Sequence, residues 1–406
     1  MVHARAVDRP EAFPFFVGAE PVERAPVACA DVTPAPRRTP GARLTLALLD
    51  AGDREVEPIW RALEAAARPV YFLTWGWVST WLAQLPVEAR PQLAVVRQGA
   101  TAVAACFLGR RRLLRHGVVP TRTRYLNATG LPQFDELCIE HNTMLCVPGV
   151  AWPLQALIDG LPADWDELAL PAIDATPLAP PDGYQLVIDR EVAAPYVDLA
   201  KVRAAGDYLS LLGGNTRAQI RRARRLVGPC ELEVARTPAD ALEIYDELVA
   251  LHTASWRRRG EPGAFADPWF ERFHRRLIIE RFAHGETQLL RLRAGGKTLG
   301  CVYNLVAHGR TLFYQSGLAD AADPRVKPGY VCQAAAIEHA AAAGGAIYDF
   351  LGGDARYKAS LSTGASRLIW ARVQRRLVRF ALEERARHLR RAFLAWRAAP
   401  ATQADR

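Results

Sequence analysis

The residues TQLLRLRAGGKTLGCVYNLVAHGRTLFYQSGL, 287–318, decide the fold of this 406-residue chain. Three apolar runs rich in β-forming residues are separated by two glycine-containing turns, which predicts an antiparallel meander. Lys327-Pro328-Gly329, an alanine-rich helix at about 330–343 and the strand AIYDFL at 346–351 follow. Because strand, helix, strand connections are right-handed crossovers, we expect 346–351 to lie parallel to a strand of the meander.

This crossover predicts where a ligand would bind. It places the N-terminus of helix 330–343 at the carboxyl edge of the sheet, where α/β sheets bind ligands. Polar groups from three segments should meet there: Tyr314 to Gly317 at the end of a meander strand, Arg325 to Tyr330 at the helix start, and YDFLGGDARYK, 348–358, after the last strand. Free amides at a helix N-terminus bind anions, and Arg325 and Lys327 would strengthen that binding.

The composition excludes several classes of protein. Half of the residues are apolar and 23% are charged, which excludes disordered, collagen-like and disulfide-scaffold chains. No apolar run approaches the ~20 residues of a membrane-spanning helix, and the start MVHARAVDRPEAFPFF lacks the apolar centre of a signal peptide, so we expect a cytoplasmic protein. The seven cysteines form no CxxC pair and the histidines lack ligand spacing, so neither disulfides nor a metal is expected.

The net charge of +9 is concentrated in two patches. Residues 215–226, NTRAQIRRARRL, contain five arginines and no acidic residue, and residues 371–406 contain ten arginines against three acidic residues. Only four of the 52 basic residues are lysines: Lys201, Lys297, Lys327 and Lys358. Because arginine is the default cation of this chain, a lysine at position 358 suggests a specific role.

The chain divides into four segments. Residues 1–41 are proline-rich and predict a disordered tail, 42–195 a first lobe, 196–375 a second lobe and 376–406 a basic amphipathic helix with a tail. The first lobe repeats the order of the second more weakly: a meander, a helix and then WDELALP, 165–171. In the second lobe, Asn215-Thr216 predicts the N-cap of a basic helix at 217–227, and Thr237 that of a helix to about 258.

The stretch 207–374 resembles the acyltransferase domain of the FemAB-like, GNAT-related proteins, which include CelD-like and BioF2-like acetyltransferase domains. The first lobe resembles the other half of the tandem arrangement in that family, through Phe72, Trp75, Trp77 and Trp81. The resemblance implies an α/β fold of two GNAT-like lobes, each a mixed, mostly antiparallel sheet flanked by helices. The matching residues are Asn215-Thr216-Arg217, Arg221, Arg222, Arg224, Arg225, Leu251-His252, Ser255-Trp256, Arg259-Gly260, Tyr314, Ser316-Gly317, Arg325, Pro328-Gly329, Tyr348-Asp349-Phe350, Gly353 and Tyr357-Lys358.

The resemblance implies an N-acyltransferase that moves an acyl group from acyl-CoA, above all acetyl-CoA, to an amine of a small or envelope-related acceptor. The family binds the CoA pyrophosphate at the helix after the meander through a glycine-rich loop, where this chain has RVKPGY, 325–330. An aminoacyl-tRNA donor, as in FemAB relatives, is the competing hypothesis. A non-catalytic nucleic-acid-binding protein is a third, although gripping phosphates would not require Asp349 and Tyr357.

Roles for individual residues follow from their chemistry and predicted place. Asp349 could take a proton from the attacking amine or orient it, Lys358 could stabilise a phosphate or the oxyanion, and Tyr357 or Tyr314 could protonate the leaving thiolate. The expected carrier-binding residues are Ser316, Arg325, Lys327, Gly329 and Tyr330. The expected acceptor-binding residues are Arg217, Arg221 and Arg225, stacked on one helix face, with Trp256 and Gly353.

The C-terminal segment LVRFALEERARHLRRAFLAWR, 377–397, has the pattern of a basic amphipathic helix. It could lie on an anionic membrane surface, bind a partner or pack on its own domain, and the sequence leaves these three alternatives open.

Overall fold

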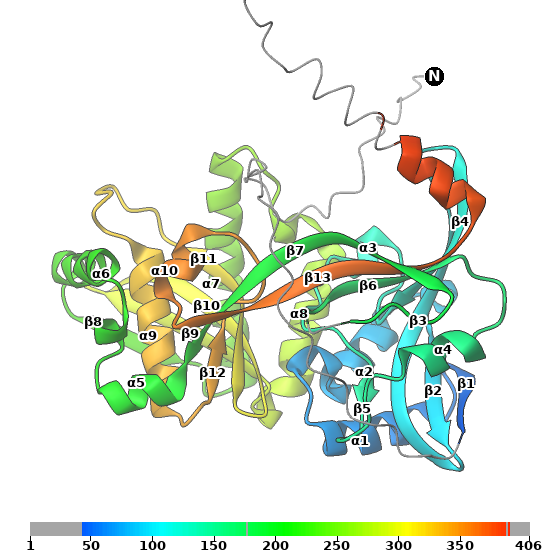
Figure 1. Cartoon of the computed structure of the whole chain (residues 1–406). Coiled ribbons are helices and arrows are strands. Elements are labelled where there is room, and N and C mark those ends of the chain that lie inside the picture. The colour runs from blue at the N-terminus through cyan, green and yellow to red at the C-terminus, as the bar shows by residue number, and fades with distance from the viewer. Residues whose placement is uncertain (1–42, 176–177, 387–388, 390–406) are drawn as a thin grey trace, which may run out of the picture.

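One mixed β-sheet of thirteen strands runs through the protein, with helices on both of its faces (Figure 1). The computed structural model describes residues 43–175, 178–386 and 389, so the expected tail at 1–41 and the end of the C-terminal segment lie outside the described residues. The strands are ordered β1-β2-β3-β4-β6-β13-β7-β12-β11-β10-β9-β8, and the short β5 pairs with β3.

The first half contributes β1 (Leu44–Asp50), α1 (Val56–Ala67), α2 (Trp75–Gln84), β2 (Gln92–Gln98), β3 (Thr101–Arg115), β4 (Val119–Leu126), α3 (Pro132–Asp135), β5 (Leu145–Cys146), α4 (Leu154–Gly160) and β6 (Glu167–Asp174). The second contributes β7 (Tyr184–Asp198), α5 (Leu199–Ala205), α6 (Gly214–Val227), β8 (Cys230–Val234), α7 (Pro238–Arg258), α8 (Pro268–Arg281), β9 (Thr287–Ala294), β10 (Lys297–Ala307), β11 (Arg310–Leu318), α9 (Pro328–Ala342), β12 (Ile347–Asp349), α10 (Arg356–Leu361) and β13 (Gly364–Arg375).

The predicted meander and crossover are confirmed. Strands β9, β10 and β11 pair antiparallel, and β12 returns through α9 to pair parallel with β11. The first half repeats this order, because β2, β3 and β4 pair antiparallel and β6 returns through α4 to pair parallel with β4. The sequence therefore encodes the same supersecondary unit twice.

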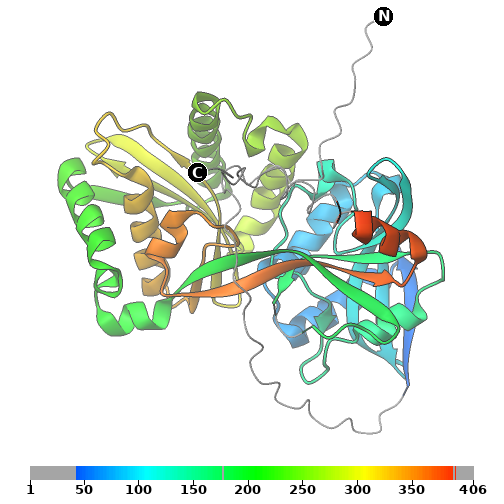
Figure 2. The same cartoon turned by 45° about the horizontal axis from the view of Figure 1, so that its top comes forward.

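Two long strands exchange between the halves (Figures 1 and 2). Strand β7 follows β6 in the chain but pairs with β12 of the second half, and β13 follows β12 but pairs with β6 of the first half. The two also pair with each other from Gly364↔Tyr196 to Arg375↔Tyr184. Strand β7, which follows the crossover of the first half, therefore joins the sheet of the second half. Strand β13, which follows the crossover of the second half, joins the sheet of the first half.

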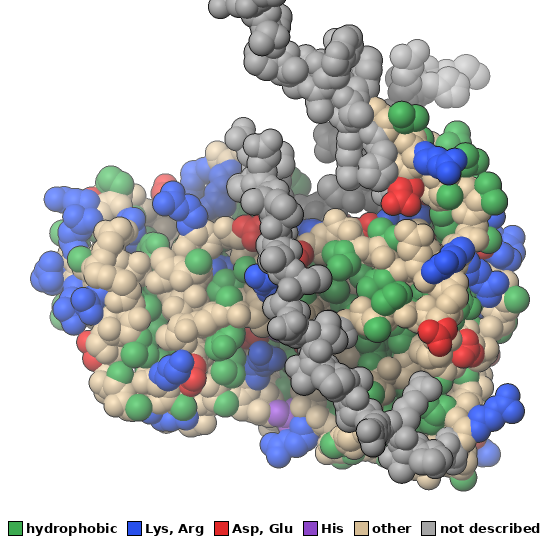
Figure 3. All heavy atoms as spheres, in the orientation of Figure 1, with side chains coloured by type: hydrophobic (Ala, Val, Ile, Leu, Met, Phe, Trp, Pro, Cys, Tyr) green, Lys and Arg blue, Asp and Glu red, His purple; other side chains and the backbone are tan. Residues whose placement is uncertain are grey.

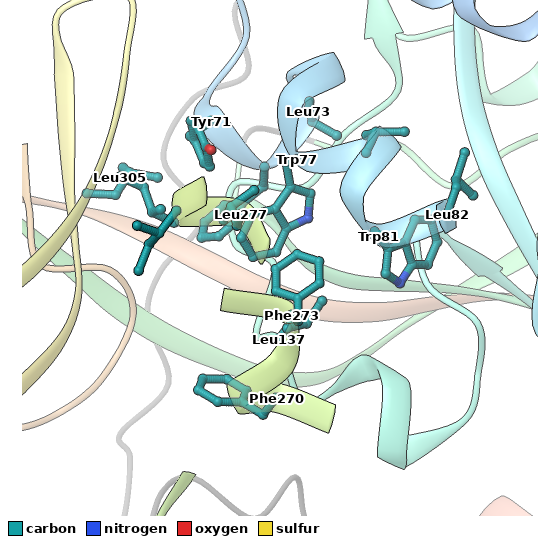
Figure 4. Close-up of a cluster of buried hydrophobic side chains, with 14 of the residues drawn as sticks. Tyr71, Leu73, Trp77, Trp81, Leu82, Leu137, Phe270, Phe273, Leu277 and Leu305 are labelled. Carbon is teal, nitrogen blue, oxygen red and sulfur yellow. The ribbon is translucent and has the colours of Figure 1, made fainter. Parts of the chain in front are cut away.

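A hydrophobic core joins the halves on one face of the sheet (Figure 4). Helix α2 of the first half packs against α8 of the second, with the ring centroids of Trp77 and Phe273 4.9 Å apart. The tryptophans that marked the first lobe in the sequence, Trp77 and Trp81, are buried in this core. Their burial fixes the position of one half against the other.

Local sequence signals were right for one helix start and wrong for another. Helix α7 begins with the expected cap, because the Thr237 side chain accepts from the Asp240 N–H and Asp240 bonds back. Helix α6 begins at Gly214, with Gly213 as its N-cap and no side-chain cap bond, so the prediction of an Asn215-Thr216 cap is wrong. Among the described residues, no helix is long and apolar enough to span a membrane.

Candidate functional site

Strands β11 and β12 separate after three residue pairs and open a wedge in the sheet. Their pairing ends at Leu312↔Asp349, whereas β11 continues along β10 to Leu318. Beyond Asp349 the other edge follows β7, since the N–H groups of Phe350 and Gly353 donate to Pro195 and Ala193. The resulting gap lies at the carboxyl end of two parallel strands, which is the edge where ligands bind in α/β sheets.

Tyr314 lies where the two strands part. It is the extra residue of a β-bulge, because β10 pairs Tyr303 with Gln315 and Asn304 with Phe313. Its hydroxyl donates to the Leu137 carbonyl at 2.8 Å and lies 3.1 Å from Nε2 of the buried His274. Burial raises the pKa of Tyr314 well above its ordinary value and lowers that of His274 to about 3. A neutral His274 can then donate to the Tyr314 oxygen.

A loop of the first half, residues 137–141, contacts β11, the end of β12 and the loop that follows β12. Leu137 accepts from Tyr314 on β11, and the Glu140 carboxylate accepts from the N–H of Gly352. His141 lies between two carboxylates, with Nδ1 2.7 Å from Asp174 and Nε2 3.1 Å from Asp349, the latter contact outside hydrogen-bond geometry. The site is therefore built jointly by both halves.

Asp349, expected as a catalytic group, is a buried anion held by cations. Its Oδ2 lies 3.3 Å from Nε of Arg310 and close to His141, and its Oδ1 accepts from the Leu351 N–H at 2.8 Å. Burial opposes its ionised form, but His141 and Arg310 outweigh that effect and hold its pKa below the ordinary value. Burial also opposes the charged form of His141, yet Asp174 and Asp349 raise its pKa to about 9.

The Asp349 contacts shape the loop that follows. Leu351 adopts a φ of 60° and Gly353 a φ of 141°, backbone conformations that residues other than glycine rarely adopt. Lys358, at the end of this loop, is buried and donates to the carbonyls of Gly352 at 2.7 Å and Leu351 at 3.4 Å. Burial lowers the pKa of Lys358 and raises the pKa of Glu140. The negative charge of Glu140 partly offsets the shift of Lys358, and the positive charge of Lys358 partly offsets the shift of Glu140.

Helix α9 starts at the mouth of the wedge, and its first turn carries several of the expected carrier-binding residues. Among the described residues, the N–H of Gly329 has no partner, whereas that of Tyr330 donates to Lys327. The Lys327 ammonium contacts Gln219 of α6 at 2.5 Å and lies over the Tyr330 ring at 5.5 Å. Tyr330 in turn contacts Ser360 of α10. One free amide and one ammonium at a helix N-terminus fit a phosphate group.

Two other expected carrier-binding residues have different surroundings. Arg325 is exposed and forms a double contact with Asp323, so binding a phosphate requires it to exchange one anion for another. Ser316 is half-buried on β11, opposite Val302 of β10.

The expected acceptor-binding residues do not all face the wedge. Arg221 and Arg225 are exposed on α6, where Lys and Arg side chains gather at one end of the molecule (Figure 3). Arg217 reaches the Ser210 carbonyl at 3.4 Å and Arg221 lies 3.3 Å from Asp207. Trp256 packs on His252 and Arg259 near the end of α7, and Gly353 lies on the wall formed with β7. The contact of Lys327 with Gln219 links α6 to the start of α9 near the wedge.

The structure thus brings Asp349, Lys358 and Tyr314 together, and it adds Glu140, His141 and Arg310, which sequence reasoning missed. The one signal for the first two was the polar tripeptide Glu140-His141-Asn142 inside an otherwise apolar stretch. Tyr357 is half-buried on α10, and its hydroxyl has no partner among the described residues. Burial raises its pKa to about 12, so it keeps its proton at neutral pH. Within the described part of the chain, no group of histidine, cysteine or acidic residues is arranged to hold a metal.

Comparison with known proteins finds one family match, which lies within the second half. Residues 214–359 match the family described as the acetyltransferase (GNAT) domain. The fold is similar to that of FemX, with 10% identity, a TM-score of 0.50 and coverage of 78% of this chain and 95% of that one. A tandem GNAT protein from the clavulanic acid biosynthesis pathway aligns over 81% of this chain and 98% of its own, at 14% identity and a TM-score of 0.43.

A conserved protein of unknown function from Bacteroides thetaiotaomicron VPI-5482 aligns over 81% of this chain and all of its own, at 13% identity and a TM-score of 0.47. No curated protein matches the chain in sequence. The matched residues include β11 and β12 of the wedge, α6, the start of α9 and the loop to Lys358. The expected GNAT-related fold agrees with this match and with the similarity to FemX.

Proposed function

Since residues 214–359 form a GNAT-type acyltransferase domain, we propose that the protein transfers an acyl group, above all acetyl, from acyl-CoA to the amine of a small or envelope-related acceptor. The observation that carries this proposal is the wedge between β11 and β12, with the start of α9 at its mouth. An extended thioester arm can add to the free edge of β11, because no described strand pairs with residues 313–318 on that side.

The carrier's phosphates would bind at the start of α9. There the Gly329 N–H and the Lys327 ammonium can donate to phosphate oxygens, and Arg325 can join them by leaving Asp323. Ser316 and Tyr330 flank this path, on β11 and on the first turn of α9. The donor set is smaller than a glycine-rich cradle, so we expect weak carrier binding that depends strongly on Lys327.

The reaction is an attack of the neutral amine on the thioester carbonyl, followed by cleavage of the carbon–sulfur bond. The amine loses one proton and the departing sulfur gains one, so the chain has only to position and relay protons. Tyr357 holds its proton and can donate a hydrogen bond to the departing sulfur. Burial raises the pKa of Glu140, so this carboxylate is the one that we assign to take the proton of the amine. Asp349 is proposed to position His141 and the loop.

An assay of thiol release tests this function. The protein is incubated with acetyl-CoA and a panel of amines, and free CoA thiol is measured with and without each amine. We expect amine-dependent release, and a kcat about 10- to 100-fold lower for Tyr357→Phe at unchanged melting temperature. The matched control is Tyr184→Phe, at the end of β7 that lies away from the wedge. Absence of both acetyl-CoA binding and thiol release would contradict the function, whereas full activity in Tyr357→Phe would remove only that residue's role.

The exposed arginines of α6 support a second candidate, an aminoacyl-tRNA donor. Arg221, Arg222 and Arg225 lie on the solvent side of this helix and could contact successive phosphates. If three such contacts form with tRNA, log affinity should fall with log salt at a slope steeper than about −2. Filter binding of bulk tRNA to the wild type and to Arg221→Gln/Arg225→Gln distinguishes the donors. Steep binding that the double variant loses favours tRNA, and weak or shallow binding favours acyl-CoA.

A further inference from the structure

The start of the C-terminal segment, residues 378–386, is a helix that lies against the tip of the β3–β4 hairpin (Figure 1). Its inner side is anchored by charge and by an aromatic ring. Glu383 accepts from Arg115 at 2.8 Å and lies 3.1 Å from His116, while the buried Phe380 lies under the Arg115 guanidinium at 5.5 Å. Arg379 adds an ion pair with the buried Asp166 at 2.7 Å. The helix therefore has a fixed orientation on the sheet.

That orientation turns an apolar stripe to the outside. Val378 and Leu382 lie one helical turn apart, on the side opposite Phe380 and Glu383, and their exposed fractions are 77% and 58%. Leu389, a described residue further along the same segment at helical spacing, is 72% exposed. Three large apolar side chains of one segment are thus exposed at helical spacing, which is unusual because soluble surfaces rarely gather such groups. We call these three residues the corner patch.

Two arginines border the corner patch. Arg376 before the helix and Arg385 within it are exposed, and neither has an acidic partner among the described residues. Arg385 continues the stripe of Val378 and Leu382 at helical spacing, so its charge stands at the edge of the apolar surface. Figure 3 shows hydrophobic and basic side chains side by side at this corner. An apolar surface bordered by unpaired cations is complementary to an interface of lipid tails and anionic headgroups.

A groove beside the helix extends the exposed apolar surface. It has a volume of about 720 Å³ and runs between the helix and the ends of β7 and β13. Val378 belongs both to the corner patch and to the groove wall, so the two surfaces are continuous. The other apolar residues of the wall are Pro180, Tyr184, Leu186, Leu377, Phe380 and Ala381.

We propose that this corner docks on the surface of an anionic phospholipid membrane. Val378, Leu382 and Leu389 enter the boundary between headgroups and acyl chains, and Arg376 and Arg385 bind the headgroup phosphates. The helix lies in the plane of the interface and does not cross it. The contacts of Glu383, Phe380 and Arg379 hold the helix in one orientation, so the docked protein has one orientation as well. The wedge and its chemistry are not part of this surface.

Flotation of the full chain with lipid vesicles tests the proposal. Vesicles of equal parts phosphatidylglycerol and phosphatidylcholine should bind the protein, and pure phosphatidylcholine vesicles should bind it much more weakly. Val378→Ser/Leu382→Ser should lower partitioning to the anionic vesicles about tenfold or more, because two apolar insertions are lost. The matched control is Val87→Ser/Ile279→Ser, which removes two equally exposed apolar side chains elsewhere, at 75% and 57%, and should change binding less than twofold.

The charge contribution is tested separately. Arg376→Gln/Arg385→Gln should weaken binding to anionic vesicles and flatten its dependence on salt, while leaving the weak binding to neutral vesicles unchanged. No binding to anionic vesicles, or equal losses in the patch and control variants, would overturn the proposal. So would sedimentation of the lipid-free wild type as a dimer that Val378→Ser/Leu382→Ser converts to a monomer, because the corner patch would then bind a second copy of the chain.

Discussion

Lys358 is a buried cation, and its surroundings change what its removal should do. From the sequence, a loop lysine is expected to matter for transfer and little for stability. In the structure it donates to two carbonyls of the Leu351–Gly353 loop, and its charge offsets that of the buried Glu140. Removing one partner of a buried pair leaves the other uncompensated, which costs more than removing both.

We therefore expect Lys358→Ala to lower the free energy of unfolding by about 3 kcal/mol or more. Glu140→Gln should recover part of that loss in the double variant. Urea denaturation of the four proteins measures both effects, and Lys201→Ala, at an exposed lysine, is the control expected to stay within about 0.5 kcal/mol. A Lys358→Ala protein as stable as the wild type would show that the ammonium carries no structural charge.

His141 should make stability depend on pH. Its pKa is raised from 6.5 to about 9, so the folded state binds the proton more tightly than the unfolded chain does. The stabilisation is complete below about pH 6.5 and is lost as the pH rises through 9, a change of roughly 3 kcal/mol. The difference in unfolding free energy between wild type and His141→Gln should shrink over this window. His284→Gln, at an exposed histidine, should show no such trend, and a pH-independent difference for His141→Gln would contradict the raised pKa.

At the residue scale, the site residues that could be predicted from the sequence lie in the second half, in the last strand of its meander and after it. Asp349, Tyr314 and Lys358 could be proposed because strand ends and a crossover place them at one sheet edge. Glu140 and His141 could not, because they come from a loop about 200 residues earlier whose approach depends on how the two halves pack. Local spacing contains no information about that packing.

At the scale of elements, the position of β11 against α7 determines the shape of the wedge wall. A Cβ added at Gly317 would lie 2.3 Å from the Leu248 carbonyl oxygen and 2.9 Å from the Leu251 Cβ, so β11 and α7 touch through the missing side chain. Backbone atoms cannot yield as a flexible side chain can. The glycine is required here by close approach.

Gly317→Ala should destabilise the fold by about 1–3 kcal/mol and raise the KM for the acyl carrier, because β11 must move away from α7. Gly52→Ala is the control, since a Cβ there meets nothing within 4 Å. Thermal unfolding and the thiol-release assay measure the two effects. Unchanged stability in Gly317→Ala would mean that α7 and β11 can separate without cost.

The elements that the sequence predicted best are those with strong periodicity and clear punctuation. The meander 287–318 and helix α7 have glycine turns or a capping box at their ends. Strand β7 was missed because YQLVIDREVAAPYVD places charges and a proline in a strand that is half exposed over most of its length. Strand β4 was likewise missed, since VPTRTRYL lacks a continuous apolar side.

At the scale of the whole molecule, exchanged strands and a shared core should make unfolding a single event. Strand β13 of the second half pairs with β6 of the first, and Trp77 packs on Phe273 across the boundary. We expect one calorimetric transition whose van't Hoff and calorimetric enthalpies agree. A fragment of residues 196–375 would lose most of β7 and all of β6 as partners of β13, so it should show no cooperative transition. Two separate transitions, or a stably folded fragment, would contradict this prediction.

The most direct test of the proposed function is a crystal structure of the full chain with acetyl-CoA. We predict that the thioester arm lies along residues 313–318 of β11 in the wedge, with a phosphate within hydrogen-bond distance of the Gly329 N–H and the Lys327 ammonium. The thioester sulfur should lie within hydrogen-bond distance of the Tyr357 hydroxyl. Phosphates bound at another part of the chain, with the wedge free of the thioester arm, would contradict the assignment of the wedge as the carrier site.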